Sequence, residues 1–197
     1  DVGHWTKPQL TYWAIAASVA TFGRNPWAAR MPSALAFLLC TWLVWRIARR
    51  LVPGGEDQAA LAFATMALPF GASQYITTDF VLAACETLAM WAFVESRFDA
   101  PGRTRRWLSL MWAAFALAFL AKGPPGLLPL AALLAFDQLL PRKRRRRVFD
   151  MAGLALFLAI AAPWFVAVMR ANPGLWGYFI GDEVVDRVAT DDFNRNG

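Results

Sequence analysis

Histidine, cysteine and charge are scarce in this 197-residue sequence, which has one histidine, two cysteines and only 17% charged side chains. The single histidine, His4, excludes a metal site built from several histidines of this chain. Cys40 and Cys85 both lie in apolar runs, which is typical of small hydrophobic side chains and argues against a disulfide scaffold. Because soluble domains average about 25% charged residues, the low charge also argues against an ordinary soluble domain.

Apolar side chains dominate instead: 58% of the residues are hydrophobic and 10 are tryptophan. A chain this apolar has too much surface to bury to stay disordered. Its 20 lysines and arginines outnumber its 14 acids, and most stand in clusters between long apolar runs. That layout is typical of a membrane protein with several spanning helices. The sequence lacks an initial methionine and ends in a polar stretch, so we expect a fragment of a longer protein.

Six apolar stretches approach the ~20 residues that a membrane-spanning helix needs. They are Trp27–Leu51, Gln58–Tyr75, Phe80–Phe98, Arg106–Ala121, Pro125–Leu140 and Val148–Met169. Leu10–Phe22 is apolar but shorter, which favours an interfacial or re-entrant helix over a span. The sequence therefore predicts an all-α, polytopic membrane bundle that forms one domain over residues 1–197. We expect an outer segment at 1–26, six spans within 27–169 and the start of an outer loop at 170–197.

The basic residues predict the orientation of this bundle. Clusters lie at 46–50, 97–106 and 142–147, and simple alternation of six helices puts all three at one membrane face. By the positive-inside rule that face is the cytoplasm. The run PRKRRRR also resembles a nucleic-acid patch, but no aromatic or glycine-rich element accompanies it. We therefore expect it to contact anionic membrane lipids, and we expect no nucleic-acid partner.

Two lysines stand out on the predicted outer face. Lys7 precedes Pro8 on an extended lead-in to Leu10–Phe22, where it is placed to meet a lipid phosphate or to snorkel as an interfacial lysine. Lys122 ends a span where the positive-inside rule disfavours a cation. We expect a phosphate or a carboxylate to hold it, or else the last carbonyls of its own helix.

The acids of the outer face also have two interpretations each. Asp79 opens a span, as a first-turn acid or as part of a site. Glu86 lies seven residues further on the same helix face, so the two predict a cleft open to the outside, unless Glu86 hydrogen-bonds a neighbouring helix. Glu183 and Arg187 have the i, i+4 spacing of a surface salt bridge.

Taken in order, the motifs of the chain resemble GT-C glycosyltransferases, which are polytopic enzymes related to protein O-mannosyltransferases and to the aminoarabinose transferase that modifies lipid A. The matching stretches are GHWTKPQLTYW with the following FG and RMPSAL, then TTDF, LAKGPPG and PWFVAVMRANPGLWGYFIGDEVVDRV. The resemblance covers nearly the whole chain, with its motifs in register.

This resemblance implies a helical bundle with an outer cleft, in a bacterial inner membrane, with the site facing the periplasm. It implies transfer of a sugar from a polyprenyl-phosphate-linked donor to a lipid, glycan or protein acceptor. It assigns Asp79 and Glu183 to catalysis, and Lys7, Tyr12, Lys122 and Arg187 to substrate binding. Two positions that hold a metal in relatives are Thr6 and Val184 here, so we expect no metal and no cofactor. The family's usual general base is expected upstream of residue 1.

Two other functions fit the same membrane frame, namely a transporter or flippase of lipid-linked sugars and a non-catalytic membrane subunit. A transporter is expected to have broken helices and internal repeats. Pro69 and Pro163 mark two candidate breaks, but the sequence shows no repeat. Proximity of the outer-face charges to one another favours an enzyme, and their dispersal favours a subunit.

Overall fold

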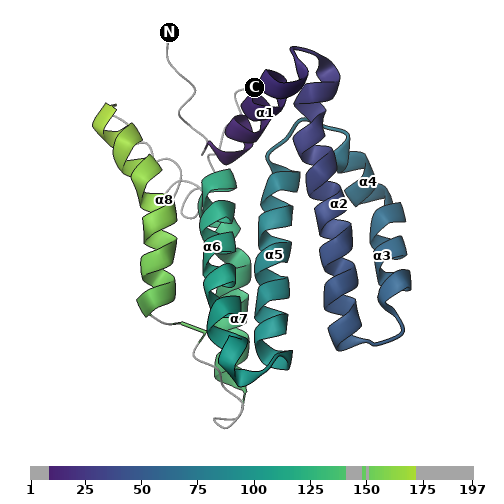
Figure 1. Cartoon of the computed structure of the whole chain (residues 1–197), viewed down its shortest axis with the longest axis vertical. Coiled ribbons are helices and arrows are strands. Elements are labelled where there is room, and N and C mark those ends of the chain that lie inside the picture. The colour runs from purple at the N-terminus through teal and green to yellow at the C-terminus, as the bar shows by residue number, and fades with distance from the viewer. Residues whose placement is uncertain (1–8, 141–147, 150, 172–197) are drawn as a thin grey trace, which may run out of the picture. The chain divides into compact units, whose positions relative to one another are not determined.

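The computed structural model describes residues 9–140, 148–149 and 151–171, and all the regular structure within them is helical. In chain order the helices are α1 (Leu10–Phe22), α2 (Pro26–Leu51), α3 (Glu56–Thr65), α4 (Ala67–Ser73), α5 (Asp79–Phe98), α6 (Thr104–Lys122), α7 (Leu128–Leu139) and α8 (Met151–Ala171), with 3-10 turns η1 (Pro101–Arg103) and η2 (Pro124–Leu127) (Figure 1). Helices α1 to α7 and α8 up to Ala161 form one compact unit.

Most predicted helices are confirmed within a few residues, because strong local signals set their ends. The predicted bounds of α1 match those observed. The Asn25 side chain caps α2 by accepting a 2.7 Å hydrogen bond from the backbone N–H of Ala28, and Pro26 occupies the first helical position. At its other end Arg49 and Arg50 lie in the last turn, where cations interact favourably with the helix dipole.

The stretch Gln58–Tyr75, predicted as one span with a candidate break at Pro69, forms two short helices, α3 and α4. Met66 separates them with an extended backbone, at φ −63° and ψ 132°. The physical cause is Pro69. Its ring cannot donate to the carbonyl of Thr65 and would clash with it in a continuous helix, so the chain breaks between them. Pro69 is tolerated in α4 because it lies in the first turn, where backbone N–H groups have no helical acceptor.

Two of the described helices, α2 and α8, are long and apolar enough to cross a membrane by length and composition. The predicted spans Trp27–Leu51 and Val148–Met169 are therefore supported, and spanning by the other four stretches stays a prediction. α5 has 20 residues but carries four charged side chains: Asp79, Glu86, Glu95 and Arg97. The predicted fifth span begins as the 3-10 turn η2 before α7.

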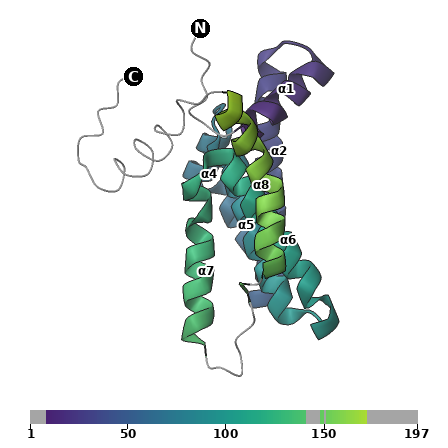
Figure 2. The ribbon, with the colours of Figure 1, turned by 90° about the vertical axis from the view of Figure 1, so that its left-hand side faces the viewer.

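Within the compact unit α2 and α5 run in the same direction and α6 runs in the opposite one, so the bundle has two ends (Figure 1). The C-termini of α2 and α5 and the start of α6 lie together at one end, which we call the basic end because it carries Arg46, Arg49, Arg50, Arg97 and Arg103. The start of α5 and the end of α6 lie at the other, which we call the Lys122 end. Turned by 90°, the ribbon shows α7 running back toward the basic end (Figure 2).

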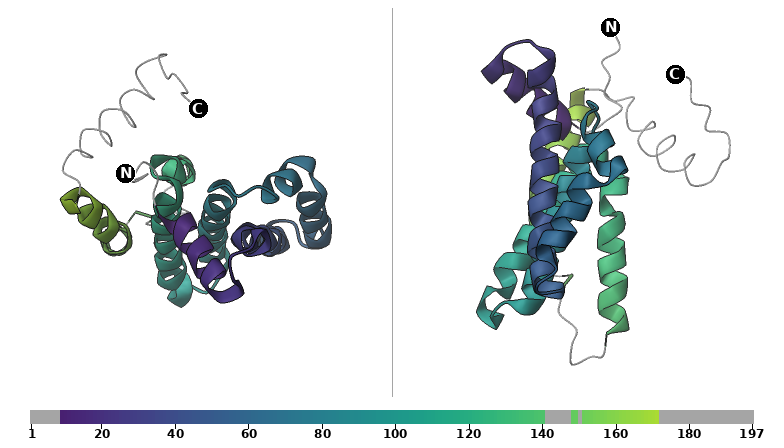
Figure 3. Two further views of the ribbon diagram at one scale, coloured as in Figure 1. Left: turned by 90° about the horizontal axis from the view of Figure 1, so that it is seen from above. Right: turned by 90° about the vertical axis from the view of Figure 1, so that its right-hand side faces the viewer.

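Helix α1 crosses the bundle at the Lys122 end, as the view from above shows (Figure 3). It contacts both α2 and α6. The Ser18 hydroxyl donates a 2.6 Å hydrogen bond to the backbone carbonyl of Ala28, which ties α1 to the first turn of α2. The placement of α1 in a membrane interface stays a prediction.

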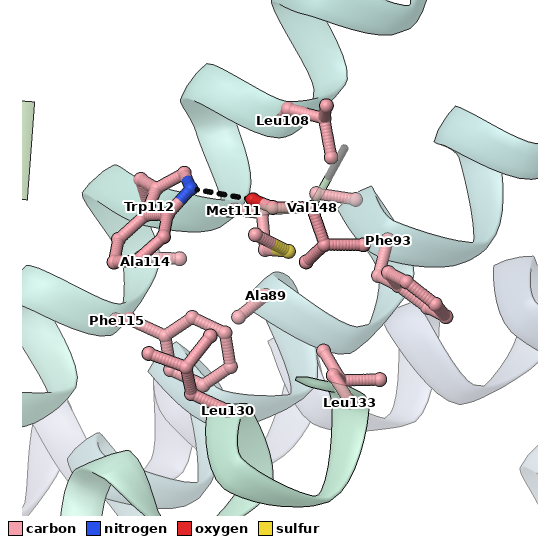
Figure 4. Close-up of a cluster of buried hydrophobic side chains, with 11 residues drawn as sticks. Ala89, Phe93, Leu108, Met111, Trp112, Ala114, Phe115, Leu130, Leu133 and Val148 are labelled. Atoms are coloured by element: carbon pink, nitrogen blue, oxygen red, sulfur yellow. Dashed lines mark hydrogen bonds between the residues drawn. The ribbon is translucent and has the colours of Figure 1, made fainter. Parts of the chain in front are cut away.

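The core lies between α5, α6 and α7 and is made of large side chains packed against alanines (Figure 4). Phe115 and Met111 are fully buried there, beside Ala89 of α5 and Leu130 of α7. The Trp112 indole N–H donates a 3.1 Å hydrogen bond to the carbonyl of Val148, so its polar atom is satisfied inside the core. This packing fixes α5 against α6 and thereby places the charged residues at both ends.

Candidate functional site

The candidate site is an ion pair between Lys122 and Asp79 at the Lys122 end. Asp79 is the first residue of α5 and Lys122 the last of α6, so the antiparallel packing of these helices brings them together across 43 residues of sequence. Both charges also suit their own helix dipoles, which favour an acid at the start and a base at the end. The expected carboxylate partner of Lys122 is therefore present.

Both partners of this pair are accessible. The side chains of Lys122 and Asp79 are 43% and 53% exposed. An exposed pair gains little net energy, since water competes for both charges. A ligand that offers a stronger anion therefore needs to displace only a weak interaction to reach the ammonium group of Lys122.

Glu86 adds a second carboxylate on the same helix. It lies seven residues after Asp79, half-buried, and within electrostatic range of Lys122. Two acids thus share one lysine along a face of α5. This arrangement pairs Asp79 with Lys122 and keeps Glu86 on the same face of α5 as Asp79.

Tyr12 lies on α1, the helix that crosses this end, and its side chain is 45% exposed. Since α1 contacts α6, Tyr12 belongs to the same end of the bundle as Lys122. The other predicted site residues, Lys7, Glu183 and Arg187, lie outside the described residues.

The part of the chain that the structure describes contains no group of three or more histidine, cysteine or acidic side chains placed to hold a metal ion. The two positions on which the no-metal expectation rests, Thr6 and Val184, lie outside it. Independence from metal therefore stays a prediction.

Sequence reasoning missed a second charged cluster, at the basic end. The side chain of Glu95 in α5 is only 2% exposed. Arg50 of α2 donates hydrogen bonds to Glu95 Oε2 from Nε at 3.1 Å and from Nη2 at 2.7 Å. The Trp91 indole N–H donates to Oε1 at 3.2 Å. A signal was present, because an acid inside an apolar helix is costly and needs a partner, and Arg50 was available at the end of the first predicted span.

A third ion pair joins α5 to α7 at the same end. Arg97 pairs with Asp137, and both side chains are largely buried. The Arg97 guanidinium also lies over the Phe93 ring, 4.9 Å from its centroid. These contacts hold the basic end of the bundle together.

Asp99 follows the last residue of α5 and lies at the basic end as well. Its carboxylate accepts hydrogen bonds from the indole N–H of Trp107 at 2.7 Å and from the backbone N–H of Ala100 at 2.8 Å. These bonds, with the nearby charge of Arg103, hold the pKa of Asp99 below its usual value.

A bundle of apolar helices with charged clusters at its two ends defines the class, a polytopic membrane protein. The family described as dolichyl-phosphate-mannose-protein mannosyltransferase matches residues 6–167 of the chain. The chain therefore belongs to this family of membrane glycosyltransferases, as its motifs predicted.

Curated relatives carry a more specific name. The chain is 30% identical over 195 residues to the undecaprenyl phosphate-alpha-4-amino-4-deoxy-L-arabinose arabinosyl transferase of Edwardsiella ictaluri, covering 95% of this chain and 35% of that protein. It is 31% identical to the enzyme of the same name from Pseudomonas paraeruginosa, covering 96% of this chain and 35% of that protein. The chain thus spans about a third of the length of these relatives.

Two solved structures share the fold. Both are of ArnT from Cupriavidus metallidurans, one in the apo state and one bound to undecaprenyl phosphate. Each matches with a TM-score of 0.81, at 25% and 27% sequence identity, covering 89% and 91% of this chain and 34% of ArnT. The predicted GT-C bundle is confirmed by this match.

Proposed function

We propose that the whole protein containing this chain is a glycosyltransferase that takes a sugar from a polyprenyl-phosphate-linked donor. Three findings support this function: membership of the mannosyltransferase family, relatives named as undecaprenyl-phosphate aminoarabinose transferases, and a structural neighbour bound to undecaprenyl phosphate. The acceptor is a lipid, glycan or protein carrying a nucleophilic hydroxyl or phosphate oxygen.

The orientation we propose puts the basic end in the cytoplasm and the Lys122 end at the periplasmic face of a bacterial inner membrane. The observation that supports it is the separation of charge, because the described arginine clusters at 46–50 and 97–106 meet at one end. Cysteine labelling of the full-length protein tests it. Gly102→Cys is expected to react only from the cytoplasmic side and Arg24→Cys only from the periplasmic side, and the reverse pattern would invert the assignment.

The observation that carries the site assignment is the accessible Lys122–Asp79 pair. The acceptor oxygen attacks the anomeric carbon as the bond from that carbon to the lipid phosphate oxygen breaks. A carboxylate accepts the acceptor proton, and the lipid phosphate leaves with its negative charge. Lys122 stabilises that charge as the phosphate replaces Asp79 beside its ammonium group. By the family resemblance, Lys7, Tyr12 and Arg187 complete the substrate contacts. Asp79 and Glu183 are the catalytic acids.

Substitution of Lys122 tests this role. A charge-assisted contact is worth about 1.5–3 kcal/mol, so Lys122→Ala in the full-length enzyme is expected to lower kcat/KM for sugar transfer about 10- to 150-fold. Lys122→Arg is expected to recover only part, since a planar fork does not replace a compact ammonium group. Arg24→Ala removes an exposed cation from the α1–α2 turn and serves as the matched control, with activity close to wild type. Near-normal turnover in Lys122→Ala would remove this residue from the site.

The same test applies to Lys7, for which the support is the family resemblance alone. Lys7→Ala is expected to weaken donor use about 10- to 150-fold, and Lys7→Arg to restore part of it. A snorkelling lysine predicts little loss with alanine and none with arginine. Transfer from a polyprenyl-phosphate sugar, measured with both variants, separates the two roles.

The alternative function, a transporter or flippase of lipid-linked sugars, draws support from the broken helix at Met66. Reconstitution of the full-length protein with a labelled lipid-linked sugar distinguishes them. An enzyme forms a glycosylated acceptor and releases polyprenyl phosphate, whereas a flippase moves the intact donor between leaflets without product.

We also expect the transfer activity to survive EDTA.

A further inference from the structure

We propose that a pocket at the basic end, remote from the Lys122 end, binds the phosphate of an anionic phospholipid headgroup. The pocket has a volume of about 220 Å³ and is lined by Arg46, Arg49, Arg50 and Glu95. Three guanidinium groups and one carboxylate face it. It lies between the last two turns of α2 and the last turn of α5, and the glycosyl transfer proposed above makes no use of it.

The charged groups of this pocket differ in how many contacts they make within the protein. Glu95 already receives two donors of Arg50 and the indole N–H of Trp91, so its charge is compensated within the protein. Arg46 Nη2 lies 3.9 Å from Glu95 Oε1, too far for a hydrogen bond. Among the residues that the structure describes, no carboxylate lies within ion-pair distance of Arg49. Arg46 and Arg49 therefore keep donors for an external anion.

Aromatic rings hold these two guanidinium groups in place. Arg46 lies 5.2 Å from the ring centroid of Trp42 and 5.0 Å from that of Trp91. Arg49 lies 5.2 Å from the ring centroid of Trp45, and the Trp45 indole N–H is itself fixed by a 2.9 Å hydrogen bond to Asp57. Contact with a ring leaves the N–H edge of a guanidinium group available, which is the geometry that recognises phosphate. The pocket is thus ordered before the anion arrives.

The surroundings of the pocket favour a lipid phosphate over a soluble one. α2 is long and apolar enough to span the membrane, so we expect the pocket at its end to lie at the depth of the headgroups. Trp42 is 45% exposed, and Leu38 and Leu39 one turn earlier are also exposed, so an apolar strip leads away from the arginines toward the membrane centre. This strip suits an acyl chain, while the arginines suit the phosphate to which it is attached.

Lipid binding to the full-length protein tests this site. The protein is purified in a neutral detergent, mixed with phosphatidylglycerol or phosphatidylcholine, and its bound lipids are counted by native mass spectrometry. We expect preferential retention of phosphatidylglycerol, with affinity lowered about 30-fold in Arg46→Gln/Arg49→Gln. The matched control is Arg105→Gln/Arg106→Gln, which removes two exposed arginines from the same end outside the pocket and is expected to keep the binding.

Further variants and a competition experiment distinguish a specific lipid site from a diffuse surface effect and from a site for soluble phosphate. Arg46→Lys/Arg49→Lys keeps both charges but loses the planar forks, and is expected to fold normally and bind with intermediate affinity. Equal loss in the control pair would show a diffuse surface effect and overturn the site. Displacement of phosphatidylglycerol by millimolar inorganic phosphate, with the same arginine dependence, would overturn the lipid assignment in favour of a soluble phosphate. Because the readout is binding and not sugar transfer, failure here leaves the proposed enzymatic function unaffected.

Discussion

The basic end buries a carboxylate and surrounds it with donors, whereas the Lys122 end leaves its ion pair in contact with solvent. Glu95 is 2% exposed and receives three hydrogen bonds from Arg50 and one from Trp91, while Asp79 and Lys122 are each about half exposed and pair with each other at the surface. A buried carboxylate becomes costly when its partner is lost, so Arg50 and Glu95 are committed to the fold. Little free energy is needed to separate the exposed pair, which suits residues that exchange partners with a substrate.

Removing Arg50 is expected to have the largest effect on stability. Arg50→Ala leaves the Glu95 charge buried with only the Trp91 indole N–H and a distant Arg46, so we expect the free energy of unfolding to fall by about 3 kcal/mol. Glu95→Ala is expected to cost less, because the half-exposed arginines regain water. Unfolding of the full-length protein by denaturant in mixed micelles measures both. The pair Arg50→Met/Glu95→Leu should recover most of the loss, and equal costs for the two single variants would contradict this explanation.

The Lys122 end depends on close packing, and Gly126 tests this. A Cβ atom at Gly126 of η2 would lie 2.7 Å from the backbone carbonyl of Ala118 in α6, and backbone cannot move aside cheaply. Gly126→Ala is therefore expected to lower the free energy of unfolding by about 1–3 kcal/mol. Gly102 of η1, at the basic end, has open space around its Cβ position, so Gly102→Ala is the control and is expected to be neutral or slightly stabilising.

The Asp79–Lys122 pair is expected to contribute little to stability. A double-mutant cycle with Asp79→Ala and Lys122→Ala, read out by the same unfolding assay, should give a coupling energy below about 1 kcal/mol that declines further with salt. A coupling energy as large as the loss caused by Arg50→Ala would remove the contrast between the two ends.

The smallest effect concerns Asp99. The hydrogen bonds from Trp107 and Ala100 lower the pKa of its carboxyl in the folded state, so the stability they supply is present above the usual pKa and is lost as the pH falls below about 4. Trp107→Phe removes the larger of these contributions. We therefore expect the unfolding midpoint of this variant to decrease less as the pH is lowered below about 4 than that of the wild type. An unchanged decrease would show that Asp99 does not take part.

Local patterns were sufficient to predict most helices and the need of Lys122 for an anionic partner. The bounds of α1 and the opening of α5 at Asp79 follow from apolar length and from first-turn chemistry. Gln58–Tyr75 does not form the single span that its hydropathy predicted; it is broken at Met66, next to the candidate break at Pro69, because the backbone consequence of a proline is a local property. Lys7, Glu183 and Arg187 stay predictions, since they lie outside the described residues.

The sequence by itself determined the class of the protein, because apolar runs, basic clusters and motifs in register require no knowledge of which helix touches which. Only the tertiary structure decided the partners. Glu95 is 45 residues from Arg50, and Asp79 is 43 residues from Lys122. Several carboxylates were available to each cation, and the choice among them was made by the packing of α5 against α2 and α6 through a shared core. Interactions between residues distant in the chain depend on that packing, which no local pattern encodes.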